Sequence, residues 1–199
     1  MSILKENTSR KKITILVFPF NLISHYLRCI VLSNRYSKTE YEFLFLKSDL
    51  YSKYVIENGY QTFSVRQFDS KFVMQCSEKF SFKWLSRGSI EEIFQSQIDA
   101  IKRLKPDAVI GDVAPTLKMA SEFTGVHYIA LMKGNLTKYY RFSRQLSRTH
   151  FSYNIIKLFP KTLACKIVDS AEKNSFIKIY KPFKRLREII PIIKSGILP

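Results

Sequence analysis

Short apolar runs, separated by segments of helical length, constrain the fold of this chain more than any other feature of its sequence. The runs Ile13–Phe18 and Ala108–Gly111 are apolar at almost every position. Strands with one face in water alternate apolar and polar residues, whereas strands covered on both faces of a parallel sheet are almost continuously apolar. We therefore expect both runs to be internal strands of a parallel sheet.

The segments between these runs continue the same alternation. Further strands are expected at Tyr41–Leu46, Thr62–Val65 and His127–Leu131. Helices are expected at Tyr51–Glu57, at Thr116–Phe123, and at a segment with Leu27, Ile30, Val31 and Asn34 on one side. Repeated strand–helix–strand units with short links predict an α/β fold, a Rossmann-like three-layer domain with right-handed crossovers.

A longer helix is predicted just before the strand at Ala108. Ser89 and Glu92 have the spacing of a capping box, and Pro106 ends the helix. Its expected buried stripe consists of Ile90, Ile93, Phe94, Ile98, Ile101 and Leu104. Residues 66–88 show no clear period, so we predict a loop there with one helical turn.

The last third of the chain has a different character. Residues 12–132 form the predicted Rossmann-like core, and residues 133–199 form a basic helical region and linker edge of the same domain. Extra C-terminal helices are expected at Phe142–Ile156, Leu163–Phe176 and Pro182–Ile190.

The net charge of +17 is concentrated in this last third. Residues 1–130 carry 18 Lys and Arg against 13 Asp and Glu, whereas residues 131–199 carry 15 against 3. The asymmetry predicts either an anionic partner or a solubilising surface, and the stretch Lys138–Arg148 is open to both interpretations. Among anionic partners we expect a membrane surface rather than nucleic acid.

Other features indicate the compartment and the absence of cofactors. No apolar run approaches the length of a membrane span, and residues 1–12 do not resemble a signal peptide. Cys29, Cys76 and Cys165 are widely spaced, which predicts reduced thiols and no metal site. We expect a cytoplasmic protein, at most peripheral to a membrane, that needs no cofactor.

A histidine and an aspartate follow two of the predicted strands. His25 lies at the start of a predicted helix, and Asp112 directly follows the run Ala108–Gly111. Both should reach the carboxyl edge of the sheet, where open α/β sheets bind ligands, and together they could act as an acid–base pair. The alternatives are that His25 is a capping or surface residue and that Asp112 caps the helix after Pro115.

The motifs around these two residues resemble the N-terminal half of GT-B glycosyltransferases of the UDP-glycosyltransferase superfamily. The resemblance covers residues 12–132 and rests on Ser24-His25-x-x-Arg28-Cys29, Lys105-Pro-Asp-x-Val-Ile-Gly-Asp112 and Met119-Ala120-x-x-x-x-Gly125-Val126. It implies an inverting transferase with two Rossmann-like halves. In such enzymes the N-terminal half binds the sugar acceptor, and the C-terminal half binds the nucleotide sugar.

The resemblance also implies roles for single residues. His25 would take the proton of the acceptor hydroxyl, and Asp112 would orient His25. The implied acceptor-binding residues are Asn21, Ser24, Arg28, Lys133 and Asn135.

The sequence departs from the family in two places. Ser24 replaces a glycine, and no glycine precedes it in the loop, so a diphosphate-binding loop is not expected. None of His25, His127 and His150 begins the His-Cys-Gly motif of the donor half. We therefore expect the donor half to be a separate domain or subunit, and this chain to be inactive alone.

Two other functions are compatible with the sequence. UDP-sugar hydrolases of nonulosonic acid synthesis, which are also GT-B proteins, have a G-H-x-x-R-C signature that matches His25, Arg28 and Cys29. The third possibility is a non-enzymatic half-fold that binds a membrane or a partner protein.

Overall fold

The computed structural model describes residues 11–79, 81–132 and 152–194, which fall into two compact units. The first unit comprises Met1–Gln75 and Glu91–Leu131 and contains the sheet. The second unit comprises Cys76–Ile90 and Met132–Pro199, and its described part is helical. Each unit is described by itself below.

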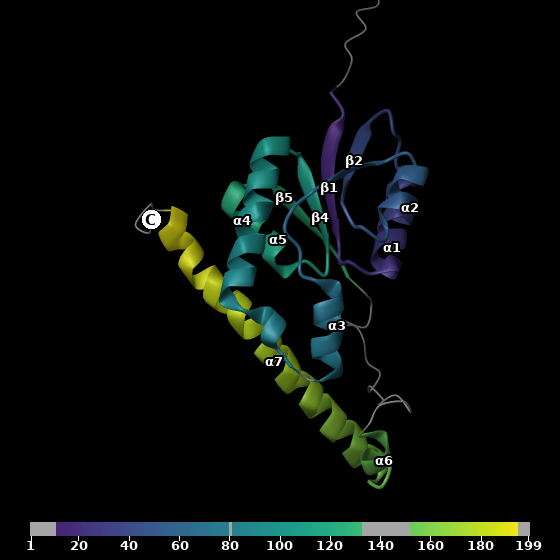
Figure 1. Ribbon diagram of the computed structural model, residues 1–199, viewed down its shortest axis with the longest axis vertical. Helices are drawn as coiled ribbons and strands as arrows, with labels where there is room; N and C mark the ends of the chain where they lie inside the picture. The colour runs from purple at the N-terminus through teal and green to yellow at the C-terminus, as the bar shows by residue number, and fades with distance from the viewer. Residues whose placement is uncertain (1–10, 80, 133–151, 195–199) are drawn as a thin grey trace, which may run out of the picture. The chain divides into compact units, whose positions relative to one another are not determined.

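A five-stranded parallel sheet forms the centre of the first unit (Figure 1). Its strand order is β3-β2-β1-β4-β5. The strands are β1 Ile13–Pro19, β2 Tyr41–Leu46, β3 Gln61–Phe63, β4 Ala108–Asp112 and β5 His127–Leu131. Helices α1 and α2 cover one face, and α4 and α5 cover the other (Figure 1), so the predicted three-layer α/β fold with a parallel sheet is confirmed.

Strands β1 and β4 are the internal strands that their apolar character predicted. Leu16 and Val109 are fully buried and lie opposite each other in the register of the two strands. The last pair in this register is Pro19 with Asp112, and the Phe20 N–H donates to the Asp112 carbonyl oxygen at 3.0 Å. The two strands therefore end together, and the residues that follow them meet at the same edge.

Helix α1 (Ile23–Ser33) packs on the sheet through a face that includes only Ile30 of the four residues predicted on one side. Leu27 and Val31 are 44% and 57% exposed, whereas Tyr26 and Cys29 are completely buried. The Tyr26 hydroxyl donates to the Leu46 carbonyl oxygen at 2.8 Å, which satisfies the phenol inside the core. The prediction was wrong because the buried face includes polar side chains, which a count of apolar residues does not recognise.

Helices α2 (Ser52–Glu57) and α5 (Pro115–Thr124) also belong to the first unit. Gly59 and Gly125 end them with positive φ angles of 76° and 78°. The Gly125 N–H donates to the Ser121 carbonyl oxygen at 2.8 Å, the bond expected of a left-handed residue after a helix.

The segment 66–88 contains more structure than the predicted single turn. Helix α3 covers Ser70–Glu78, and a short 3₁₀ helix η1 covers Lys83–Leu85. The Asp69 carboxylate accepts the Lys71 N–H at 2.9 Å and the Phe72 N–H at 3.3 Å, as an N-cap does. This local cap favours a helix even though, among the side chains of α3 that the structure describes, only Val73 and Cys76 are buried.

Helix α4 (Arg87–Leu104) begins before the predicted capping box. Ser86 is its cap, because the Ser86 hydroxyl oxygen accepts the Ser89 N–H at 3.3 Å. Glu92 instead forms an exposed ion pair of 3.4 Å with Arg66. The predicted stripe is buried from Ile90 to Ile101, and its last member, Leu104, is half-buried.

The described part of the second unit includes α6 (Tyr153–Ile156) and α7 (Lys161–Lys194). Helix α7 is one continuous helix where the sequence predicted two, since Pro182 does not end it. A proline costs a helix one backbone hydrogen bond, but Phe183 and Leu186 directly after it are buried and favour continuation. Most of the predicted helix Phe142–Ile156 lies outside the described residues. No helix in the described ranges is long and apolar enough to cross a membrane.

We predict that Gly111→Ala lowers the free energy of unfolding by about 1–3 kcal/mol through overpacking. A Cβ on Gly111 would lie 2.8 Å from the Tyr128 hydroxyl oxygen and 3.2 Å from Leu117 Cδ2. The matched control is Gly88→Ala in α4, where a Cβ has no atom within 4 Å. Urea unfolding should show Gly88→Ala unchanged or stabilised by up to about 1 kcal/mol. A Gly111→Ala protein as stable as the wild type would contradict this packing.

Candidate functional site

The turn between β1 and α1 places His25 at the carboxyl edge of the sheet. The Leu22 N–H donates to the Phe20 carbonyl oxygen at 2.6 Å, so the chain reverses within three residues of β1. Helix α1 then begins at Ile23, and His25 lies in its first turn. Its side chain faces inward and His25 is only 4% exposed. The interpretation of His25 as a surface residue is therefore wrong.

Asp112 is the last residue of β4 and is completely buried. Because a buried carboxylate without partners is very costly, its contacts are decisive. The Arg28 guanidinium donates to it twice, from Nε to Oδ2 and from Nη2 to Oδ1. This bidentate geometry is the strongest form of arginine–carboxylate pairing. Asp112 does not cap α5, whose N-cap is Ala114.

His25 and Arg28 are three residues apart on α1 and so lie on the same face of the helix. His25 Nδ1 lies 3.0 Å from Asp112 Oδ2 and 2.8 Å from Arg28 Nη2. Arginine can only donate and the carboxylate can only accept, so one tautomer of His25 serves each contact. With a proton on Nδ1, His25 donates to Asp112 and leaves Nε2 as a base. With the proton on Nε2, His25 accepts from Arg28.

Cys29 lies next to this cluster on α1 but is not a nucleophile. Burial raises the pKa of the Cys29 thiol to about 12, and the charge of Asp112 adds to the rise. Burial likewise raises the pKa of the Tyr26 hydroxyl. Both groups stay protonated near neutral pH, and all three cysteines of the chain are free. Neither Cys29 nor Tyr26 therefore adds a charge to the site.

The predicted acceptor-binding residues have different environments. Asn21 accepts from the Ser48 hydroxyl at 2.7 Å and donates to the Ser70 hydroxyl oxygen at 3.3 Å, so it is held at the edge of the sheet. Ser24 is exposed at the start of α1. Arg28 is tied to Asp112 and so positions the catalytic candidates. Lys133 and Asn135 lie outside the described residues.

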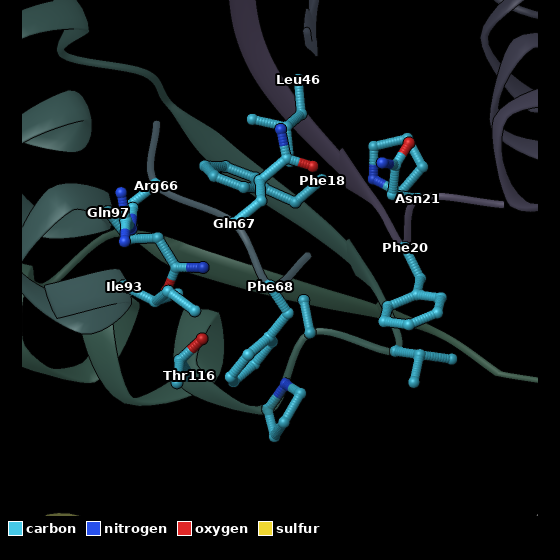
Figure 2. Close-up of a pocket in the computed structure, with 14 residues that line it drawn as sticks. Phe18, Phe20, Asn21, Leu46, Arg66, Gln67, Phe68, Ile93, Gln97 and Thr116 are labelled. Atoms are coloured by element: carbon cyan, nitrogen blue, oxygen red, sulfur yellow. The ribbon is translucent and has the colours of Figure 1, made fainter. Parts of the chain in front are cut away.

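Two pockets open at the same edge of the first unit. A small apolar pocket of about 50 Å³ is lined by Phe18, Phe20 and Phe68, and Gln97 and Arg66 also line its wall (Figure 2). A larger polar pocket of about 610 Å³ is formed by Asn21 and the loops that follow β2 and β3. Apart from Asn21, the lining residues were missed because the sequence does not show how the loops that follow the strands fold together. The polar residues that follow the predicted strands at Leu46 and Val65 were the available signal.

Within the described ranges, no group of three or more His, Cys, Asp or Glu residues could hold a metal ion. His25 and Asp112 share their site with an arginine, whose positive charge opposes a cation.

The chain is similar to solved structures of glycosyltransferases. The chain is 14% identical to MurG of Acinetobacter baumannii, over 60% of this chain and 33% of that one, with a TM-score of 0.42. It is 14% identical to the spinosyn rhamnosyltransferase SpnG, over 59% and 34%, with a TM-score of 0.46. It is 15% identical to the structure of SpnG complexed with spinosyn aglycone, over 58% of this chain and 33% of that one, with a TM-score of 0.40.

The chain thus spans about one third of the length of these solved structures. At this identity and with TM-scores below 0.5, neither activity nor substrate follows from them. No family model matches the chain, and no curated protein is found to be similar.

We predict that Arg28→Ala lowers the free energy of unfolding by about 3–5 kcal/mol, because it leaves the buried Asp112 charge without its partner. Arg28→Ala combined with Asp112→Asn should recover a large part of this loss, since the buried charge is then gone. Arg35→Ala, an exposed arginine near the end of the same helix, should change stability by less than about 0.5 kcal/mol. An Arg28→Ala protein that unfolds at the wild-type urea concentration would refute the buried ion pair.

Proposed function

We propose that this chain is the acceptor-binding half of an inverting GT-B glycosyltransferase that uses a nucleotide sugar. The observation that carries the proposal is the cluster of His25, Arg28 and Asp112 at the carboxyl edge of a parallel sheet. Open α/β sheets bind ligands at this edge. The three residues are also those in which the sequence resembles the transferase motifs.

The proposed reaction uses His25 as a general base. His25 Nδ1–H donates to Asp112 Oδ2, and Nε2 takes the proton of the acceptor hydroxyl. The hydroxyl oxygen attacks the anomeric carbon of the donor sugar as the bond to the nucleotide phosphate breaks. Attack from the face opposite the leaving group inverts the configuration at this carbon. The proton remains on His25, and the nucleotide leaves with the electron pair.

Arg28 supports this step as a positioning residue. Its two hydrogen bonds hold both oxygens of Asp112, so that Oδ2 stays within reach of His25 Nδ1. It also compensates the charge of a carboxylate that has no exposure to water. The Arg28 side chain is 28% exposed, so it is only partly shielded from water.

The donor nucleotide requires protein groups outside this cluster. The turn from Phe20 to Leu22 contains no glycine, and backbone amides approach phosphates closely only where side chains are small. We propose that a second domain or subunit binds the nucleotide sugar and completes the enzyme.

A UDP-sugar hydrolase is the second candidate, and the position of Arg28 beside His25 favours it, because its signature shares both residues. The same base would then activate water instead of a sugar hydroxyl. One assay distinguishes the two reactions. A hydrolase releases free sugar from the UDP-sugar when no acceptor is present, whereas a transferase needs the acceptor.

We predict that His25 holds its proton on Nδ1 near neutral pH, because the base role requires a free Nε2. Proton–nitrogen correlation spectra tuned to the two-bond couplings of imidazoles distinguish the tautomers directly in this chain. In the assembled transferase, His25→Gln should lower turnover by about 10² to 10⁴, since glutamine can donate to Asp112 but cannot accept the proton. His127→Gln is the matched control, because His127 is exposed at the start of β5. A proton found on Nε2, with Nδ1 accepting from Arg28, would eliminate the general-base role.

We also propose that the second unit contacts an anionic membrane surface. Ile155, Leu158 and Leu163 are 61%, 79% and 44% exposed around the junction of α6 and α7. Lys157 and Lys161 are exposed in the same short segment. Exposed apolar side chains interspersed with lysines suit the interface of an anionic bilayer, where the lysines meet headgroups and the apolar groups meet acyl chains.

The expected result is salt-dependent binding to vesicles that contain phosphatidylserine. Each lysine near the surface contributes about 1 kcal/mol, and salt screens this attraction. Leu158→Glu should weaken sedimentation with the vesicles, whereas Ile56→Glu should not, since Ile56 is 62% exposed on α2 of the first unit. Equal binding by both variants, or none at low salt, would refute the membrane contact.

A further inference from the structure

The larger pocket lies beside the candidate active site and is built by a different set of loops. Residues 47–50, which follow β2, and residues 64–65 and 67–71, which follow β3, line it together with Asn21. All these segments follow the carboxyl ends of parallel strands, the edge that also carries His25. The pocket volume of about 610 Å³ is typical of sites for small molecules.

Asn21 connects this pocket to the turn that carries His25. Its side chain is held by Ser48 on one rim and by Ser70 on the other. The neighbouring residue, Phe20, has its ring 5.8 Å from the His25 ring, measured between centroids. The turn that carries His25 and the polar pocket are therefore joined through two consecutive residues, Phe20 and Asn21.

The charges of the pocket indicate a neutral ligand. Its lining includes two cations, Lys47 and Lys71, and two anions, Asp49 and Asp69, which balance. Helix α3 begins in this wall, but Asp69 already accepts the Lys71 and Phe72 N–H groups, so the first-turn amides are not open to a phosphate. The turn before His25 also lacks a glycine for close approach to an anion.

The lining groups suit a molecule rich in hydroxyls. Ser48, Ser64, Gln67 and Ser70 supply hydroxyl and amide groups, which both donate and accept hydrogen bonds. Phe68 adds an aromatic ring against which the C–H face of a sugar can pack.

The apolar pocket is too small to be the main acceptor site. Its volume of about 50 Å³ has room for one or two water molecules. Gln97 on its wall is 5% exposed, and its Oε1 has no hydrogen-bond partner in the described part of the chain, so a water there would satisfy it.

We propose that the acceptor is a neutral saccharide and that it binds in the polar pocket of residues 47–50 and 64–71 with one hydroxyl at His25. This inference rests on the proposed function for the role of the sugar as acceptor. The pocket itself is defined by its volume, its balanced charge and its hydroxyl and amide groups, independently of catalysis.

The test is a titration of the full chain, labelled with ¹⁵N, with three neutral disaccharides: cellobiose, maltose and sucrose. At least one should cause saturable shifts in the amides of residues 47–50 and 64–71, with a Kd in the millimolar range. Inorganic pyrophosphate and n-hexanol are the competing probes, since they represent a phosphate-bearing acceptor and an apolar acceptor. Neither should shift these amides.

Two variants locate the site. Ser64→Phe fills the pocket and should weaken disaccharide binding at least tenfold, whereas Ser170→Phe, at an exposed position of α7, should not. Lys71→Glu gives the lining a net negative charge and is the variant for the pyrophosphate titration, because an anionic ligand would lose its binding when this charge is reversed. Lys79→Glu is the matched charge control.

The outcomes separate this inference from the proposed function. Wild type and His25→Gln could both bind a disaccharide in the pocket while the assembled wild-type enzyme transfers no sugar. This result would support the saccharide site and refute the transferase. Transfer to an apolar or phosphate-bearing acceptor, with no disaccharide shifts in the pocket, would keep the transferase and refute the saccharide site. Pyrophosphate binding that Lys71→Glu abolishes would also overturn the neutral ligand.

Discussion

The buried ion pair between Arg28 and Asp112 is the interaction on which the site depends. Asp112 has no exposure to water, and both of its oxygens receive a hydrogen bond from Arg28. The pair ties the first turns of α1 to the end of β4, and the Phe20 N–H bond to the Asp112 backbone ties the intervening turn to the same strand. His25 takes its position from these contacts. Replacing such a pair by apolar residues is often neutral for stability, so we interpret it as a device for positioning His25.

The turn from Phe20 to Leu22 joins the three parts of the candidate site. Phe20 separates the small apolar pocket from His25, and Asn21 borders the polar pocket. Side-chain hydrogen bonds of Asn21 fix this turn to Ser48, in the loop after β2, and to Ser70, the first residue of α3. An acceptor that binds these loops would therefore be aligned by the same residues that orient the base. Holding the hydroxyl and the base in the right geometry lowers the barrier to proton transfer.

Much of the first unit could be predicted because its local signals agree. Continuous apolar strands identify β1 and β4, and Gly125 ends α5 with the positive φ angle that glycine adopts readily. Predictions failed where local and tertiary effects compete. Polar groups on the buried face of α1 conceal its orientation, and Pro182 lies inside α7 because buried side chains follow it.

The sequence by itself determined that His25 and Asp112 would meet, because the carboxyl ends of parallel strands share one edge of a sheet. It did not determine that Arg28 would clamp Asp112 or that two partners would compete for His25 Nδ1. Those contacts depend on the rotation of α1 about its axis, which core packing sets. The polar pocket likewise combines loops that are distant in sequence. Only the tertiary structure brings their side chains together, because neither periodicity nor strand order encodes which way a loop folds.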